Sequence, residues 1–426
     1  MSGEVRVPGD KSISHRAIML GAIADGTTRI RGFLEGEDAL ATLAAFRSMG
    51  VEIEGPKHGN VTVHGVGLHG LKAPPQALDL GNAGTGMRLI CGLLAGQSFD
   101  TELTGDASLC SRPMGRVIDP LAMMGANIQS ADGERPPLTI AGGQKLRSIH
   151  YELPMASAQV KSCVLLAGLY SEGCTSVLEP GPSRDHTERM LRGFGYPVRS
   201  DENTISLDGG GRLQGCEIDV PADISSAAFF LVAASIAPGS DLMLTHVGIN
   251  PTRIGVINVL RLMGADITLH NQREVGGEPV ADIRVCSAPL EGIEIPLDQV
   301  PLAIDEFPAL FIAAACATGR TVLRGAEELR VKESDRIAAM ADGLSILGIK
   351  SEVLEDGIII EGGIFGGGVI KTYHDHRIAM SFAIAALRAA HEITILDCDH
   401  VATSFPDFEG LARALGLQIQ AEASEG

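Results

Sequence analysis

The sequence of 426 residues has no long hydrophobic run. One of the longest, Ala227 to Ala237, ends at Pro238-Gly239, short of the roughly 20 apolar residues that a membrane-spanning helix needs. The segment Met1 to Glu4 is not a basic region followed by an apolar one, as a secretory signal would be. We therefore expect a cytoplasmic protein without a membrane span, with disorder confined at most to the tail Ala421 to Gly426.

Positive charge is also scarce. The sequence has 34 Lys and Arg residues against 53 Asp and Glu residues. The resulting formal net charge of -19 argues against nucleic-acid binding through a broad basic surface. The eight cysteines include no CxxC pair and no Cys/His cluster at zinc spacing, so we expect buried free thiols in a reducing compartment. His374 and His376 form an HxH pair, which alone is weak evidence for a metal site, and none is predicted.

What the sequence does contain is one pattern that returns six times: an apolar helix rich in small residues, a Gly-centred turn, a short strand, and a second helix that ends near Gly. The first helices are expected at Ser12 to Ala24, Gly86 to Ala95, Ser157 to Tyr170, Ser225 to Ala237, Phe307 to Ala317 and Arg377 to Ala390. The strands are expected at Thr28 to Gly32, Asp100 to Gly105, Thr175 to Glu179, Leu242 to Val247, Thr321 to Gly325 and Ile393 to Asp397. The second helices are expected at Asp38 to Met49, Met114 to Met124, Thr187 to Phe194, Ile254 to Met263, Ser334 to Leu347 and Phe408 to Leu415.

The copies begin about 70 residues apart, which suits a βαβαββ unit better than a solenoid repeat. We predict an α/β protein of two similar domains, each with three such units. The first domain would comprise residues 1–9 and 223–426, and the second residues 10–222. Because several first helices are apolar nearly all round, they should be buried with strands outside them, as in an inside-out α/β barrel. Helix-strand alternation is common in α/β proteins, but the constant order and recurring Gly-Thr turns favour true repeats.

Basic residues gather at the starts of these helices. Helix N-termini present unpaired amide donors and a positive dipole end, so added Lys or Arg makes an anion site, although a solvated surface role is the plain alternative for each. The residues concerned are Lys11, Arg16, Arg112, Arg184, Arg253, Arg336 and Arg377. The run Gly81 to Arg88 could let a ligand approach the backbone, or could be only a turn. It lacks GxGxxG spacing, and the Lys11 turn is no Walker A loop.

Carboxylates stand beside basic groups in two places. Asp305-Glu306 precedes a predicted buried helix, and in the run Lys332 to Arg336 two acidic residues lie between a lysine and an arginine. Such a setting can tune pKa values for proton transfer. Helix capping by Ser334 and Asp335 is the alternative role for those two residues.

These segments together resemble the 5-enolpyruvylshikimate-3-phosphate (EPSP) synthase family, and the resemblance covers nearly the whole chain. The segments are Pro8 to Arg16, Gly81 to Arg88, Arg112 to Arg116, Arg330 to Arg336 and Asp375 to Arg377. The resemblance implies an enolpyruvyl transferase of the shikimate pathway for aromatic amino-acid biosynthesis. It also implies a two-domain fold of six repeated units, with substrates in the cleft where helix N-termini converge.

The resemblance further implies residue roles. Shikimate 3-phosphate would be held by Lys11, Ser12, Arg16, Ser157, Gln159, Asp305 and Lys332, with Arg184 near its phosphate. Phosphoenolpyruvate would contact Lys11, Gly84, Arg112, Arg336 and Arg377. Asp305 would act as the base at the 5-hydroxyl, and Glu333, assisted by Lys11, would carry the proton at C3 of phosphoenolpyruvate. No cofactor would be needed.

Two departures from the commoner family pattern resemble a divergent branch that includes glyphosate-insensitive enzymes. Thr403 replaces a lysine, and Ser183 to His186 replaces a Ser-Lys-Pro-Tyr-like run. The roles of Thr403, Arg184 and His186 stay open. Glyphosate competes with phosphoenolpyruvate in this family and lies near the position matched by Gly84, where insensitive relatives carry alanine.

Two other functions are compatible with the same fold. A UDP-N-acetylglucosamine enolpyruvyl transferase carries a loop cysteine five residues before the arginine matching Arg112, but that position here is Ala107, and Cys110 is displaced. A non-catalytic anion-binding protein is disfavoured because Asp305 and Glu333 accompany the phosphate-binding residues.

Overall fold

The computed structural model describes residues 1–422, so most of the tail expected to be disordered lies outside the described residues. The chain forms two compact units. The first unit contains residues 1–8, 221–273 and the chain from Pro279 onward, and the second contains residues 9–220 with the short segment 274–278. Sequence patterns did not indicate this short return of the chain to the second unit.

Six separate sheets are present in the described part of the chain, one for each predicted copy of the repeat. The strand orders in the second unit are β13(Glu217–Asp219)-β2(Asp25–Arg31)-β4(Asn60–Val66)-β3(Glu52–Lys57), β5(Leu78–Asp79)-β6(Thr101–Thr104)-β8(Arg135–Ala141)-β7(Asn127–Ala131) and β9(His150–Glu152)-β10(Cys174–Leu178)-β12(Thr204–Asp208)-β11(Arg199–Asp201). Those in the first unit are β1(Ser2–Val5)-β14(Asp241–Gly248)-β16(Glu278–Cys286)-β15(Asp266–Val275), β17(Arg320–Leu323)-β19(Ile358–Glu361)-β18(Ser351–Val353) and β20(Gly368–Lys371)-β21(Ile393–Leu396).

The sheets repeat one pairing scheme. In each four-stranded sheet an edge strand runs parallel to the strand predicted for that copy, which then pairs antiparallel with the next; examples are β13 with β2, β2 with β4, β9 with β10 and β10 with β12. The parallel partner comes from a different copy of the repeat, since β13 ends the second unit and β2 begins it. Neighbouring copies within a unit are thereby tied together through backbone hydrogen bonds.

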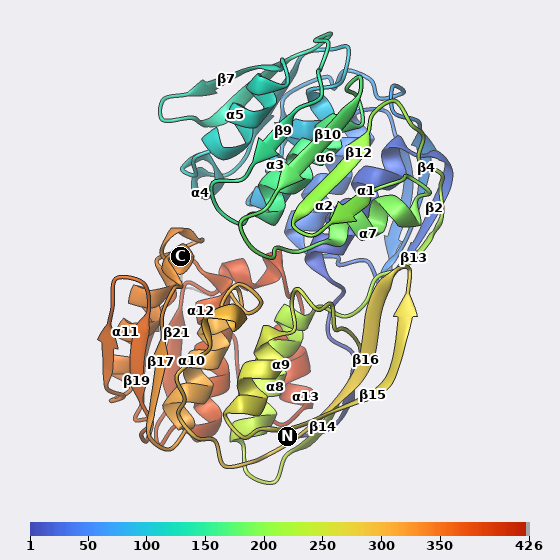
Figure 1. Cartoon of the computed structure of the whole chain (residues 1–426). Coiled ribbons are helices and arrows are strands. Elements are labelled where there is room, and N and C mark those ends of the chain that lie inside the picture. Colours follow the sequence, from blue (N-terminus) through green and yellow to red (C-terminus); the bar gives the residue numbers. More distant parts are fainter. Residues whose placement is uncertain (423–426) are drawn as a thin grey trace. The chain divides into compact units, whose positions relative to one another are not determined.

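The helices are inside and the strands outside in each unit, as predicted (Figure 1). The first helices of the copies are α1(Lys11–Ile23), α3(Gly84–Leu94), α6(Ala158–Gly168), α8(Ile224–Ile236), α10(Phe307–Cys316) and α12(His376–Ala385). The second helices are α2(Glu37–Ser48), α5(Gly115–Met123), α7(His186–Gly193), α9(Gly255–Leu262), α11(Arg336–Ile346) and α13(Phe408–Ala414). Every residue of α8 is buried, as its apolar circumference requires. No helix among residues 1–422 is long and apolar enough to span a membrane.

The shorter helical segments are α4(Ala107–Cys110), η1(Leu297–Gln299), η2(Glu327–Val331), η3(Ala386–Arg388) and η4(Asp399–Thr403). A glycine ends each second helix in a left-handed conformation, with φ of 84° at Gly50, 98° at Gly125, 77° at Gly195, 97° at Gly264, 82° at Gly348 and 100° at Gly416. Side chains other than glycine rarely adopt this conformation, so these positions fix where the second helix of each copy stops.

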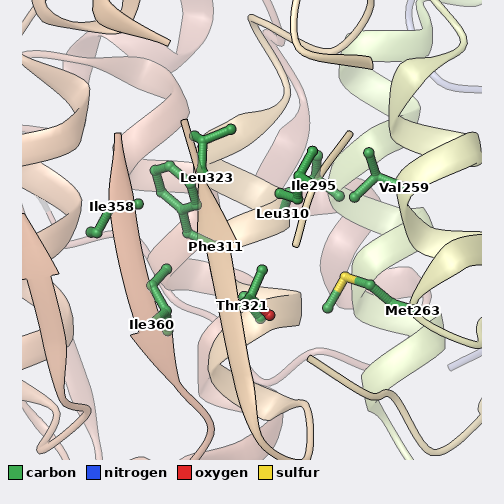
Figure 2. Close-up of a pocket in the computed structure, with 10 residues that line it drawn as sticks. Val259, Met263, Ile295, Leu310, Phe311, Thr321, Leu323, Ile358 and Ile360 are labelled. Atoms are coloured by element: carbon green, nitrogen blue, oxygen red, sulfur yellow. The ribbon is translucent and has the colours of Figure 1, made fainter. Parts of the chain in front are cut away.

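One part of the first unit's core lies between α9, α10, β17 and β19. Figure 2 shows Val259, Leu310, Phe311 and Ile360 lining this region, with the side chain of Thr321 among them. Thr321 is only 4% exposed, and its Oγ1 has no hydrogen-bond partner among the described residues. A buried hydroxyl without a partner loses its hydration and gains nothing in return.

We predict that Thr321→Val raises the free energy of unfolding of the first unit by about 1 kcal/mol, because the shape is kept and an unsatisfied hydroxyl is removed. Urea denaturation of the two proteins would measure the change. Thr175→Val is the matched control: Thr175 occupies the same place in β10, but its Oγ1 lies 3.1 Å from Ser171 Oγ, so this variant should lose stability. Equal effects at both positions would contradict the explanation.

Candidate active site

In the second unit the first cluster of candidate residues forms at the start of α1. The Asp10 carboxylate caps this helix by accepting a hydrogen bond of 2.9 Å from the backbone N–H of Ile13. Lys11 and Ser12 therefore stand in the first turn, where backbone donors are unpaired. The Lys11 ammonium lies 3.0 Å from Asp38 Oδ2 and keeps a side chain that is 20% exposed. The α1 terminus thus offers a fixed cation that solvent reaches.

Arg16, one turn further, is almost fully buried, and neutral groups hold it. Its Nε donates to Thr187 Oγ1 at 2.7 Å, Nη2 to Ser162 Oγ at 2.9 Å, and Nη1 to the Ser12 carbonyl at 2.9 Å. Burial lowers the pKa of Arg16 to about 10, an effect that the Glu188 carboxylate opposes. The guanidinium is consequently charged at neutral pH and fixed in orientation, as an anion ligand requires.

A second cluster surrounds Gly84, the first residue of α3. A Cβ atom at this position would lie 3.0 Å from Arg112 Nη1 and 3.1 Å from Arg88 Nη1. The Arg112 Nη2 donates to Asn82 Oδ1 at 2.6 Å, while Arg88 Nη1 donates to Gln159 Oε1 at 3.1 Å. The structure therefore brings Gly84, Arg112 and Gln159 together. Arg88, which lies in the sequence motif but was assigned no role, joins them.

Helix α6 connects the two clusters. It is capped by Ser157, whose Oγ accepts a hydrogen bond of 3.4 Å from the Val160 backbone N–H, and it carries both Gln159 and Ser162. Arg184 immediately precedes the N-cap of α7, and its positive charge acts on Arg16. The second unit thus contains eight of the predicted site residues, at or near helix N-termini: Lys11, Ser12, Arg16, Gly84, Arg112, Ser157, Gln159 and Arg184.

In the first unit the candidate residues converge on one buried guanidinium. Arg336, which is 1% exposed, lies between three carboxylates: Nε is 2.8 Å from Asp375 Oδ2, Nη2 is 2.6 Å from Glu333 Oε2, and Nη1 is 3.5 Å from Asp305 Oδ1. Burial alone would lower the pKa of Arg336, but these carboxylates raise it above its ordinary value. In return, although burial opposes it, the Arg336 charge holds the pKa of Asp375 below its usual range.

The two remaining predicted residues of the first unit join the same group. Lys332 Nζ lies 3.4 Å from Asp305 Oδ1 and also forms an ion pair with Glu328. Arg377 Nη1 donates to the Asp305 backbone carbonyl at 2.9 Å, and its backbone N–H is capped by Asp375 at 2.9 Å. Asp305, Lys332, Glu333, Arg336 and Arg377 therefore form one cluster of alternating charge.

Several residues outside the predicted site support this cluster. Glu306 is 2% exposed, accepts a hydrogen bond from Ser225 Oγ, and lies 3.9 Å from both Arg253 Nη2 and Arg377 Nη1. Arg253 donates to Ser225 Oγ at 2.6 Å. The signal for Glu306 was its place beside Asp305 before an apolar helix, where a buried carboxylate must find a cation.

The residues of uncertain role occupy defined places. Thr403 is buried in η4, where its Oγ1 donates to the His400 carbonyl at 2.7 Å. His186 opens α7 and its Nδ1 lies 2.7 Å from Glu278 Oε1.

Residues that could hold a metal ion lie outside both clusters. Among the described residues, the ligand atoms of Glu52, Glu54 and His64 on β3 and β4 lie within 4.8 Å of one another. This group does not include the HxH pair of the sequence.

Comparison with known proteins gives a consistent result. The family model described as EPSP synthase (3-phosphoshikimate 1-carboxyvinyltransferase) matches residues 1–411. A protein named 3-phosphoshikimate 1-carboxyvinyltransferase from Alkalilimnicola ehrlichii is 66% identical over 100% of this chain and 96% of its own length. A protein of the same name from Methylococcus capsulatus is also 66% identical, over 99% of this chain and 96% of its own.

A solved structure agrees at the level of the fold. The structure of EPSP synthase from Acinetobacter baumannii superimposes with a TM-score of 0.91 at 63% sequence identity, covering 99% of this chain and 97% of that one. These matches do not favour the UDP-N-acetylglucosamine alternative. With the family model matching almost the whole sequence, the chain belongs to the EPSP synthase (3-phosphoshikimate 1-carboxyvinyltransferase) family.

Proposed function

We propose that the chain transfers the enolpyruvyl group of phosphoenolpyruvate to the 5-hydroxyl of shikimate 3-phosphate and releases phosphate, as a step of aromatic amino-acid biosynthesis. Beside the family membership, the supporting observation is the Arg336 cluster, which holds the carboxylates of Asp305 and Glu333 next to cations. Phosphate release from phosphoenolpyruvate should depend on shikimate 3-phosphate and should not occur with UDP-N-acetylglucosamine. The opposite acceptor preference would overturn the proposal.

We propose that shikimate 3-phosphate is held by the residues that the sequence resemblance implied. They are Lys11, Ser12, Arg16, Ser157, Gln159, Arg184, Asp305 and Lys332. Support comes from the fixed, charged Arg16 guanidinium and from the helix N-termini at which the other residues of the second unit stand. We propose Arg184 as a contact of the phosphate group.

Phosphoenolpyruvate carries a carboxylate and a phosphate, so several cations are needed to bind it. We propose Lys11, Gly84, Arg112, Arg336 and Arg377. Arg336 Nη1 is buried and makes no hydrogen bond within the described part of the chain, which leaves a donor for a ligand oxygen. At Gly84 the absence of a side chain keeps space open beside Arg112.

The proposed chemistry uses two carboxylates and no cofactor. The oxygen of the 5-hydroxyl attacks C2 of phosphoenolpyruvate while Asp305 accepts the hydroxyl proton. C3 of phosphoenolpyruvate gains a proton from Glu333, with Lys11 assisting. The resulting tetrahedral intermediate then loses phosphate from C2 while the Glu333 carboxylate takes a proton from C3, which restores the double bond. Lys332 and Arg336 lie beside Asp305 and stabilise negative charge there.

We also propose that the two units correspond to the two domains expected from the sequence, residues 1–9 with 223–426 and residues 10–222. They differ from these bounds at Gly9, at residues 221–222 and in the segment 274–278. The cytoplasm is the proposed location, and the eight free cysteines are in keeping with a reducing compartment.

Asp305→Asn and Glu333→Gln should each lower kcat by about 100-fold or more, because each removes a proton carrier but keeps the shape of the side chain. The dissociation constants of both substrates should change little. Steady-state kinetics and calorimetric binding would measure the two effects, with the exposed Asp298→Asn as a control. If these carboxylates serve only to neutralise Arg336, the variants will instead lose stability or phosphoenolpyruvate affinity at nearly normal kcat.

For glyphosate we predict inhibition of the wild-type enzyme, despite the departures at Thr403 and in the run Ser183 to His186, because Gly84 lacks a methyl group that would crowd the inhibitor. The variant Gly84→Ala should weaken glyphosate more than phosphoenolpyruvate, since its Cβ would press on the Arg112 and Arg88 guanidinium groups in a closely packed site. Inhibition and Michaelis constants of both forms test this. A wild type that is already insensitive, or equal losses for both ligands, would disprove it.

A further inference from the structure

Lys161 lies on the buried face of α6, next to Ser162, one of the two residues whose hydroxyls bind Arg16. Lys161 is 1% exposed, and its Nζ lies 2.8 Å from Glu179 Oε2 and 2.7 Å from Glu188 Oε1. Both carboxylates are buried as well, at 7% and 2% exposed. Buried charges are costly unless they are paired, so the two ion pairs hold Lys161, Glu179 and Glu188 in this arrangement. Lys161 has no role in the proposed chemistry.

Lys161 and Glu188 are connected to Arg16 through the residues next to them in the sequence. Ser162, which follows Lys161, accepts a hydrogen bond from Arg16 Nη2, and Thr187, which precedes Glu188, accepts one from Arg16 Nε. The Ser162 and Thr187 hydroxyls also lie 2.7 Å apart. One pair of adjacent residues on α6 and another on α7 thus supply both an ion pair and the two hydroxyls that orient Arg16.

Lys161 is also connected, through Glu179, to the segment that carries Arg184. Ser183 Oγ donates a hydrogen bond to Glu179, whose second oxygen is held by Lys161. On the far side of Arg184, His186 is anchored to Glu278 at 2.7 Å. The backbone that carries Arg184 is therefore fixed before and after this residue, within a run whose function the sequence left open.

We propose that Lys161 and Glu179 are positioning residues that set the substrate-binding arginines Arg16 and Arg184 for the phosphate of shikimate 3-phosphate. The inference rests on the proposed function. Lys161 balances the two buried carboxylates, so Glu179 and Glu188 do not compete with a ligand phosphate for the arginines. Without that ammonium, the carboxylates of Glu179 and Glu188 would draw Arg16 and Arg184 toward themselves and away from the substrate.

The test compares Lys161→Met with the double variant Lys161→Met/Glu179→Gln. The single variant should weaken shikimate 3-phosphate binding by about 10-fold or more, by the energetics of an unpaired buried charge. The affinity for shikimate, which lacks the phosphate, and the KM for phosphoenolpyruvate should change by less than about 2-fold. The double variant should regain most of the lost affinity, because Gln can still accept the Ser183 hydrogen bond and one excess carboxylate is gone.

Calorimetric titration gives the dissociation constants of shikimate 3-phosphate and shikimate, and their ratio reports the phosphate contact alone. Arg284→Met, which breaks an exposed ion pair with Asp241, is the matched control and should leave all values unchanged. A merely structural role for Lys161 would lower the melting temperature and weaken every ligand alike, with no recovery in the double variant. That result would overturn the inference.

If Lys161→Met does not fold, Ser183→Ala provides a second test. It removes only the hydrogen bond between Ser183 and Glu179, next to Arg184. It should weaken shikimate 3-phosphate by about 3-fold or more while shikimate is unaffected, and no change would count against the inference. Failure of the proposed function is recognised separately. In that case the wild type itself would not bind shikimate 3-phosphate. If instead Arg184→Gln lost the binding of shikimate 3-phosphate and Lys161→Met kept it in full, only the positioning role would be rejected.

Discussion

The buried guanidinium of Arg336 is the interaction on which the candidate site of the first unit depends. Three carboxylates surround it, those of Asp305, Glu333 and Asp375, and Asp375 also caps helix α12. Asp375 and Arg336 are both fully buried, and removing one partner of that pair would cost about 3–5 kcal/mol, because a desolvated charge is left behind. All three carboxylates thus contact the same guanidinium, and the pair of Asp375 with Arg336 connects the start of α12, which carries Arg377, to the start of α11.

The same construction appears at other helix starts. Capping side chains accept hydrogen bonds from the first turns: Asp10 for α1, Ser157 for α6, Asp223 for α8, Asp335 for α11 and Asp375 for α12. A capped terminus still leaves other backbone donors unpaired, and the dipole favours an anion there. The repeat thus supplies helix ends whose donors and dipoles favour anions, in a chain whose net charge is -19.

Much of the fold could be predicted because its signals are local. The glycines after the second helices, of which Gly50 is one, adopt the left-handed conformation that the pattern required, and the first helices are buried as their composition indicates. Helix ends were less certain: α12 gives way to η3 at Ala386, and α11 begins at Arg336 rather than Ser334. The segment 274–278 could not be predicted, because it is anchored by Glu278 to His186, 92 residues away in sequence.

For the site, the sequence indicated which residue types stand at helix starts but not how their charges are shared. Lys11 is paired with Asp38, and Lys332 is paired with both Asp305 and Glu328. At the proposed site, a phosphate or carboxylate ligand would therefore compete with carboxylates already in contact with these cations. Such competition would lower the affinity for any single anion and favour a substrate that engages several cations at once. Arg16 differs, since hydroxyl and carbonyl oxygens hold it, so its charge is oriented without being directly neutralised.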